Sequence, residues 1–310
     1  MPGRLEPLVT LPENGELDLD TGKGRNAVVF EADDVVGDIR YAIKVFRRTR
    51  NRIDREIQML QHLRGGRNIV SYFETLNDDE GVPRALVLEA VDHTDFRQLF
   101  PQFGMGDIQY YASELIEAIC FCHSHGVMHR DIRPHNIVIN PQTKQLRLVG
   151  WGSAKFWDPG EDHSVRVSLF KPPELLVDYR KYDFSIDMWG FGSVLASLVF
   201  RKEPFFHGNS ISDMLVKISK VLGTDELFDF LDKFEIELDE HILSQLEYQP
   251  RRPWSSFITP ENESNVSDEV FDLLNRVLRY NPRERLSADE ASFHQFFTMV
   301  TGNYVVIEQD

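Results

Sequence analysis

The chain has very little cysteine, with only Cys120 and Cys122 among its 310 residues. Two positions apart on a helix, they point to different faces and could not easily form a disulfide. His123 and His125 lie beside them, but neighbours on one helix would not converge on a metal ion. We therefore expect buried thiols in a protein of a reducing compartment, the cytoplasm or the nucleus.

The chain also lacks long apolar runs and an excess of basic residues. Its longest apolar stretch, 194–200, is far too short to cross a bilayer. We expect no secretory signal and no lipid anchor, because neither end carries such a motif. Asp and Glu number 50 against 34 Lys and Arg, giving a net charge of −16. This charge argues against general binding to nucleic acid or anionic membranes, while leaving room for a local basic patch.

The residue pattern changes near position 90. Before it, strands are predicted at 27–31, 41–46, 70–73 and 85–88, and a helix by the spacing of Ile53, Ile57, Leu60 and Leu63. After it come a long helix that has apolar residues from Ile108 to Cys122 on one face and ends near Gly126, short strands at 137–139 and 146–148, and an almost wholly helical pattern from Ser185 onward. The pattern predicts an α+β fold with a small β-rich lobe at 1–90 and a larger α-helical lobe at 91–310. Ligands favour the crevice between two such lobes.

A turn that contains glycine lies ahead of the first predicted strand. Gly22 and Gly24 flank Lys23, and Val29 follows on the strand itself. Glycines let backbone amides approach phosphate groups without side-chain collision. A simple tight turn explains these glycines equally well, so this motif alone decides nothing.

A lysine and a glutamate follow at a spacing that suits phosphate binding. Lys44 ends Tyr-Ala-Ile-Lys on a predicted strand, and Glu56 lies on the predicted helix that follows. An ammonium can bind nucleotide phosphates, and a carboxylate on the next helix would hold it in place. An isolated lysine on a strand is, by contrast, usually a solvent-exposed charge.

The most specific motif is His-Arg-Asp-Ile-Arg-Pro-His-Asn at 129–136. Asp131 could accept or orient a hydroxyl proton, and Asn136 could offer an amide oxygen to Mg²⁺. Further along, Pro-Pro-Glu at 172–174 and the distant Arg285 predict a buried ion pair between Glu174 and Arg285, which would stabilise the helical lobe.

In their order and spacing, these motifs resemble the signature set of eukaryotic Ser/Thr protein kinases, from about Gly15 to Phe297. Within that family the chain is most similar to the catalytic subunits of casein kinase II. The segments that carry this likeness are 55–57, 94–96, 128–136, 151, 173–178, 200–206, 215–218, 220–225 and 278–280. The resemblance implies a bilobal protein kinase fold and a single kinase domain over 1–310.

The resemblance also implies roles for individual residues. ATP, with GTP as an alternative, would be bound by Gly22, Gly24, Val29, Ala42, Lys44, Glu56, Glu89 and Val91. Asp131 and Arg133 would act in phosphoryl transfer, and Asn136 would be a Mg²⁺ ligand. Acidic proteins or peptides would be bound by Arg47, Arg48, Arg50, Arg166 and Lys171. A solvated helix start explains the arginine run equally well.

The main departure from the family is at Gly150. The family has an aspartate there that chelates Mg²⁺, so Asn136 is the only recognisable ligand left, and we expect weak metal binding or none. The metal contributes several kcal/mol to catalysis, which corresponds to a rate loss of about a thousandfold or more. Glu161 and Asp162 have no spacing that recommends either as a substitute ligand.

Two smaller departures concern the phosphate and the acceptor. Arg133 stands where the family has a lysine that reaches the γ-phosphate, which keeps the charge but alters its geometry. Only Ser168 and Leu169 lie where the family places a longer segment, in the loop that positions the acceptor hydroxyl.

Three functions remain open from the sequence. The first is a pseudokinase that binds nucleotide or partners and transfers phosphate poorly or not at all. The second is an active acidophilic Ser/Thr kinase, favoured by the presence of Lys44, Glu56, Asp131 and Asn136. The third is a nucleotide-independent module that binds the family's regulatory subunit on the small-lobe sheet, where Phe30 matches an apolar docking position.

Overall fold

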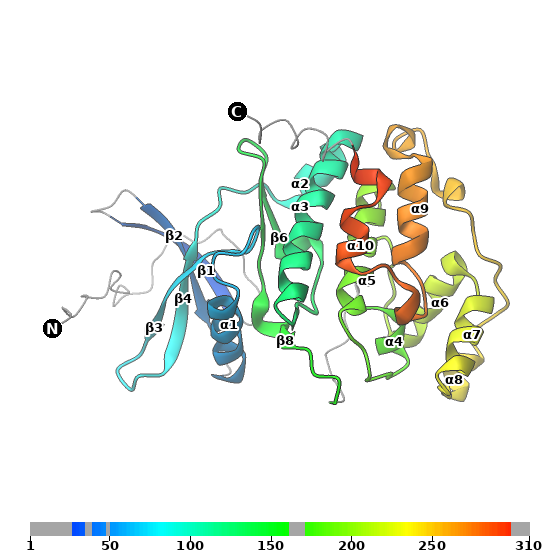
Figure 1. Ribbon diagram of the computed structural model, residues 1–310, viewed down its shortest axis with the longest axis horizontal. Coiled ribbons are helices and arrows are strands. Elements are labelled where there is room, and N and C mark those ends of the chain that lie inside the picture. The colour runs from blue at the N-terminus through cyan, green and yellow to red at the C-terminus, as the bar shows by residue number, and fades with distance from the viewer. Residues whose placement is uncertain (1–26, 35–38, 48–49, 161–170, 299–310) are drawn as a thin grey trace.

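The computed structural model describes residues 27–34, 39–47, 50–160 and 171–298, and it has the two lobes that the sequence predicts (Figure 1). Four of the candidate site residues, Gly22, Gly24, Arg48 and Arg166, lie outside the described residues, and so does the segment at 161–170. The strands and the helix that lie within 27–89 form the small lobe, and the later helices form the large lobe.

The small lobe is a four-stranded antiparallel sheet with one helix. The strands follow the order β1-β2-β4-β3, namely β1 (Ala27–Asp34), β2 (Ile39–Phe46), β4 (Pro83–Glu89) and β3 (Tyr72–Asn77). Helix α1 (Arg50–His62) buries Ile53, Met59 and Leu60 together with Leu86 and Leu88 of β4. The predicted strands and helix are confirmed, although β3 lies further along the chain than 70–73.

The large lobe is built around α5 (Ser185–Val199), whose residues are all buried. Helices α3 (Met105–Ser124) and α9 (Asp268–Val277) pack against α5, and α10 (Ala288–Ser292) packs against α3 (Figure 1). The other helices are α2 (Phe96–Leu99), α4 (Pro173–Leu176), α6 (Ile211–Leu222), α7 (Asp225–Lys233) and α8 (Glu240–Leu243). Most side chains of α5 are apolar, as expected for a helix in a core, and the buried carboxylate of Asp187 lies near its start.

Two pairs of short strands fix the segments at the junction of the lobes. β5 (Val127–Met128) pairs with β8 (Lys155–Phe156), and β6 (Ile137–Asn140) pairs with β7 (Gln145–Leu148). The segment 129–136 connects β5 to β6, and the segment 149–154 connects β7 to β8. The pairing therefore brings the two segments that carry the chemical motifs side by side.

An ion pair predicted from the sequence lies in the core of the large lobe. The guanidinium of Arg285 donates to both carboxylate oxygens of Glu174, at 2.6 and 2.5 Å, and both side chains are fully buried. The two residues are far apart in the chain, so the pair fastens α4 to the end of the domain.

The two cysteines are thiols of the large lobe, with Cys122 buried and Cys120 half-buried on α3. Burial raises the pKa of Cys120 to about 11 and the pKa of Cys122 well above its usual value. Among the described residues, no three His, Cys, Asp or Glu side chains are grouped so as to hold a metal ion. No helix in this part of the chain is long and apolar enough to span a membrane.

Candidate active site

Lys44 and Glu56 form an ion pair between the sheet and the helix of the small lobe. Lys44 lies on β2 opposite Val29 of β1, and Glu56 lies on the buried side of α1. Nζ of Lys44 is 2.5 Å from Oε1 of Glu56, whose side chain is 3% exposed. A Cβ atom placed on Gly152 would lie 3.3 Å from Oε2 of Glu56, so the pair borders the 149–154 segment. The structure thus brings together the lysine and glutamate that the sequence paired.

A buried carboxylate of the large lobe holds the 129–136 segment. Asp187 of α5 accepts hydrogen bonds from the backbone N–H of His129 at 2.8 Å and of Arg130 at 2.7 Å. Nε2 of His123 lies 3.0 Å from the same carboxylate. Burial alone would raise the pKa of Asp187, but the hydrogen bonds and the neighbouring histidines outweigh it, so its pKa lies below the usual value. Asp187 therefore fixes the backbone at the start of the segment that carries Asp131.

Arg130 joins the two junction segments. Its backbone has a positive φ of 63°, and its Nε donates to the carbonyl oxygen of Ser153 at 2.7 Å. A second nitrogen of the guanidinium donates to the hydroxyl of Tyr182 at 3.0 Å. Segments 129–136 and 149–154 therefore share a side chain as well as paired strands.

The carboxylate of Asp131 is the candidate acid–base group, and it is 20% exposed. Its Oδ2 accepts a hydrogen bond from Nδ2 of Asn136 at 2.9 Å and lies 3.4 Å from Nε of Arg133. That Nε is buried and makes no hydrogen bond. Asp131, Arg133 and Asn136 thus form one cluster, in which the carboxylate could orient a hydroxyl proton.

Gly150 has a left-handed backbone, with φ 85° and ψ 41°, at the entry to the short 3₁₀ helix Trp151–Ser153. A Cβ atom at this position would lie 2.7 Å from Cγ of Asn136, and closer still to its Oδ1. The amide of Asn136 therefore occupies the space from which a side chain at 150 would extend.

The resemblance to protein kinases implies Mg²⁺ at this position, but the side chains around Gly150 do not fit a bound ion. Mg²⁺ demands octahedral oxygen coordination, usually with one or two carboxylates. Here the side chain beside Gly150 is the neutral amide of Asn136, and the carboxylate bonded to that amide is that of Asp131. The ion-binding arrangement that the family would supply is absent from this cluster.

Trp151 follows Gly150 and is fully buried. Its Nε1 donates to the carbonyl oxygen of Leu148 at 3.2 Å, and its ring meets the ring of His129 edge-on at 4.6 Å between centroids. The indole is therefore part of the core beneath the junction segments.

Lys171 is buried, whereas a residue that binds acidic peptides is expected at the surface. The side chain is 4% exposed, and its ammonium donates to the carbonyl oxygen of Arg130. Burial lowers the pKa of Lys171 to about 8, although Asp131 and Asp187 attract its charge. A lysine held in this way does not present its charge to an acidic peptide, so that part of the sequence interpretation is corrected.

The remaining predicted residues divide between the sheet and the connection of the lobes. Val29 and Ala42 are half-buried on β1 and β2, Arg47 is exposed, and the side chain of Arg50 lies outside what the structure describes. The carbonyl oxygen of Val91, which follows β4, lies 3.1 Å from Nδ1 of His93.

Glu89, at the end of β4, faces a partner that sequence reasoning missed. Nε of Arg147 on β7 lies 3.0 Å from Oε2 of Glu89, and Gln145 donates to Oε1 at 3.2 Å. Burial of Glu89 opposes ionisation, but Arg147 and the backbone N–H of Ser71 hold its pKa below the usual value. Any contact of Glu89 with a nucleotide is therefore left to its backbone. The sequence did contain a signal for this contact, because Arg147 is a charged residue in the otherwise apolar predicted strand 146–148.

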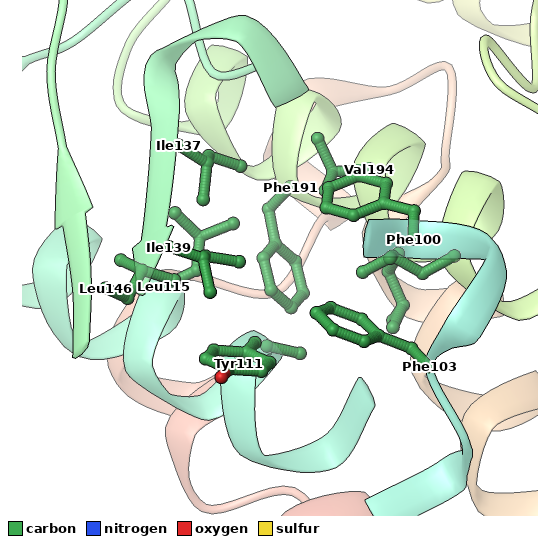
Figure 2. Close-up of a pocket in the computed structure, with 12 residues that line it drawn as sticks. Phe100, Phe103, Tyr111, Leu115, Ile137, Ile139, Leu146, Phe191 and Val194 are labelled. Atoms are coloured by element: carbon green, nitrogen blue, oxygen red, sulfur yellow. The ribbon is translucent and has the colours of Figure 1, made fainter. Parts of the chain in front are cut away.

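An apolar cavity in the large lobe is a separate feature. Figure 2 shows Phe100 and Phe103 on one side of it and Ile137 and Ile139 on the other, with Phe191 between. Its lining side chains are all apolar except for the phenol of Tyr111. None of the candidate site residues predicted from the sequence lines this cavity.

The fold and the junction cluster define an ATP-dependent phosphotransferase architecture, with a lysine–glutamate pair in one lobe and an aspartate-bearing segment in the other. The family model described as "protein kinase domain" matches residues 17–297. The chain belongs to the protein kinase family. Membership implies use of ATP, usually with Mg²⁺, and protein substrates.

Proposed function

We propose that this protein is a pseudokinase similar to the catalytic subunits of casein kinase II, which binds ATP and transfers its γ-phosphate weakly or not at all. The observation that carries the proposal is Gly150 with the amide of Asn136 in its side-chain space, because this cluster offers Mg²⁺ no carboxylate besides Asp131. Bound Mg²⁺ would neutralise charge on the transferred phosphoryl group.

Nucleotide binding is the part of the kinase function that this proposal retains. The Lys44–Glu56 pair supports it, because it holds a fixed ammonium on β2. Arg133 adds a second cation beside Asp131. The proposed nucleotide-binding residues are Gly22, Gly24, Val29, Ala42, Lys44, Glu56, Glu89 and Val91, with ATP as the main ligand and GTP as an alternative.

A transfer assay tests the proposal directly. Purified protein would be incubated with ATP, Mg²⁺ or Mn²⁺, and an acidic serine peptide, beside an Asp131→Ala variant. Kinases usually turn over about 1–100 times per second, so a thousandfold loss predicts at most about 0.1 per second. Turnover at ordinary kinase rates that Asp131→Ala abolishes would show an active acidophilic Ser/Thr kinase instead. That is the alternative function, and the retained Asp131 and Asn136 favour it.

A second candidate function is docking of a casein kinase II regulatory subunit on the small-lobe sheet. Ile43, Ala85 and Val87 form a cluster apart from the main core, with Phe30 and Tyr41 packed against it. Residues that alternate with them, such as Leu86 and Leu88, face α1, so this cluster lies on the opposite face of the sheet. Phe73 is 49% exposed and meets Tyr41 edge-on at 5.2 Å between ring centroids.

Co-sedimentation with a purified regulatory subunit tests this docking. We expect Phe30→Asp to abolish binding, whereas Phe293→Asp, at an exposed phenylalanine of the other lobe, leaves it unchanged. Binding that survives Phe30→Asp would place the contact elsewhere. The proposal has two further parts. The protein binds acidic proteins or peptides near Arg47, and it is located in the cytoplasm or the nucleus.

A further inference from the structure

The amide nitrogen of Asn136 is bonded to Asp131, and its oxygen is the atom nearest the Cβ position of Gly150. Asn136 is 9% exposed, and its Nδ2 donates to the backbone oxygen of Asp131 at 2.7 Å and to Oδ2 of Asp131 at 2.9 Å. Both amide hydrogens therefore bind the residue that would carry out acid–base chemistry. The amide orients Asp131.

The backbone around Gly150 is fastened to the same segment. Val149 N–H donates to the carbonyl oxygen of Asn136 at 2.9 Å, and the carbonyl oxygen of Val149 lies 3.0 Å from Nε2 of the buried His129. Gly150 follows directly with its left-handed φ of 85°. Neither segment can move away without breaking these bonds, so the approach of Asn136 to Gly150 is held from both sides.

The space at Gly150 is occupied by a side chain. Among the described glycines with positive φ, Gly65, Gly81 and Gly126 have open space, and a Cβ atom at Gly223 would lie 2.7 Å from the backbone nitrogen of Arg251. A Cβ atom at Gly150 would lie 2.7 Å from Cγ and 3.1 Å from Nδ2 of Asn136. At Gly126, which has φ 72°, a Cβ atom would meet nothing within 4 Å. Alanine at Gly126 would thus suffer only backbone strain, while alanine at Gly150 would suffer the same strain and a collision.

We propose that Asn136 is a positioning residue in this protein and that its amide has taken the place of the missing carboxylate, so that nucleotide binds here without a divalent ion. It follows that Gly150→Asp alone does not recreate an ion site, because Asn136 blocks the new side chain. The statement about metal rests on the proposed nucleotide binding. The statement about Asn136 and Gly150 does not.

The first experiment measures thermal unfolding without nucleotide. We expect Gly150→Ala to lower Tm by more than Gly126→Ala does, and Asn136→Ala in the Gly150→Ala background to recover the excess. Equal falls in Tm for the two glycine variants would overturn the proposal. If the Asn136 variants do not fold, the comparison of the two glycine variants still decides.

The second experiment measures the Kd of ATP in EDTA and in Mg²⁺. For the unmodified protein, Gly150→Asp and Asn136→Ala, we expect the two values to agree within about twofold, because none of the three holds an ion. If Asn136 were instead a Mg²⁺ ligand, the unmodified protein would bind ATP more tightly in Mg²⁺ than in EDTA, and Asn136→Ala would lose that gain; this result would overturn the proposal. A gain of about tenfold or more on adding Mg²⁺ to Gly150→Asp would also overturn the proposal.

The two experiments distinguish a failure of the proposed nucleotide binding from a failure of the inference about Asn136. If ATP binds in neither buffer, the proposed nucleotide binding is wrong, while the Tm comparison of the glycine variants still tests the contact of Asn136 with Gly150. If ATP binds tightly only with Mg²⁺ to the unmodified protein, the metal-free inference is wrong and the nucleotide-binding function stands.

Discussion

The ammonium of Lys171 donates to the carbonyl oxygen of Arg130, which places a buried charge directly behind the segment that carries Asp131. Burial lowers the pKa of Lys171 to about 8, from an ordinary value of 10.5. A single backbone oxygen thus replaces most of the water that a lysine on the surface would have.

We expect the stability difference between Lys171→Met and the unmodified protein to shift in favour of the unmodified protein as pH rises from 8 to 10. In this window the unfolded chain still binds the proton of Lys171 and the folded chain has lost it, so the free energy of unfolding rises with pH. The methionine variant lacks this rise. Urea unfolding at several pH values measures it.

Lys181→Met is the control, because Lys181 is exposed. Its stability difference from the unmodified protein should stay constant over the same pH range. A constant difference for Lys171→Met as well would contradict a buried, weakly compensated ammonium.

Arg285→Ala should destabilise the protein by about 3–5 kcal/mol, because it leaves the buried carboxylate of Glu174 without its partner. Arg180→Ala removes an exposed arginine 2.8 Å from Asp178 and should cost about 1 kcal/mol or less. Chemical denaturation compares the two. Equal losses would mean that the Glu174–Arg285 pair contributes no more than a surface pair.

Lys44→Met should weaken ATP binding at least about tenfold and also lower stability by about 1–3 kcal/mol, because the buried Glu56 loses its partner. Adding Glu56→Gln should recover part of the stability and none of the binding. Tm without nucleotide and the Kd of ATP report the two effects separately. If the second substitution also restored binding, Lys44 would not be a nucleotide contact.

Both cysteines should react slowly with a maleimide in the folded protein. A pKa of about 11 for Cys120, raised from 9.0, lowers its thiolate fraction about a hundredfold, and Cys122 is more deeply buried. Labelling followed by mass spectrometry checks this, with protein in urea as the reactive control. Fast labelling of Cys122 under native conditions would show that α3 opens.

The motifs at 129–136 and 172–174, together with Lys44, are local in sequence, and the switch from alternating to helical periodicity is local too. These features predicted the two lobes, the order of most elements, the Lys44–Glu56 pair and the Glu174–Arg285 pair. The absence of a carboxylate at Gly150 is likewise visible in the sequence. By itself, then, the sequence determined the kinase fold and a residue without a carboxylate at position 150.

The tertiary structure alone decided which side chain lies against Gly150. Asn136 and Gly150 meet because β6 pairs with β7, and no local pattern encodes the 2.7 Å that would separate Cγ of Asn136 from a Cβ at 150. The burial of Lys171 and the turn of Glu89 toward Arg147 also depend on segments that are distant in the chain. Side-chain positions of this kind follow from close packing between elements, which residue types and spacing do not specify.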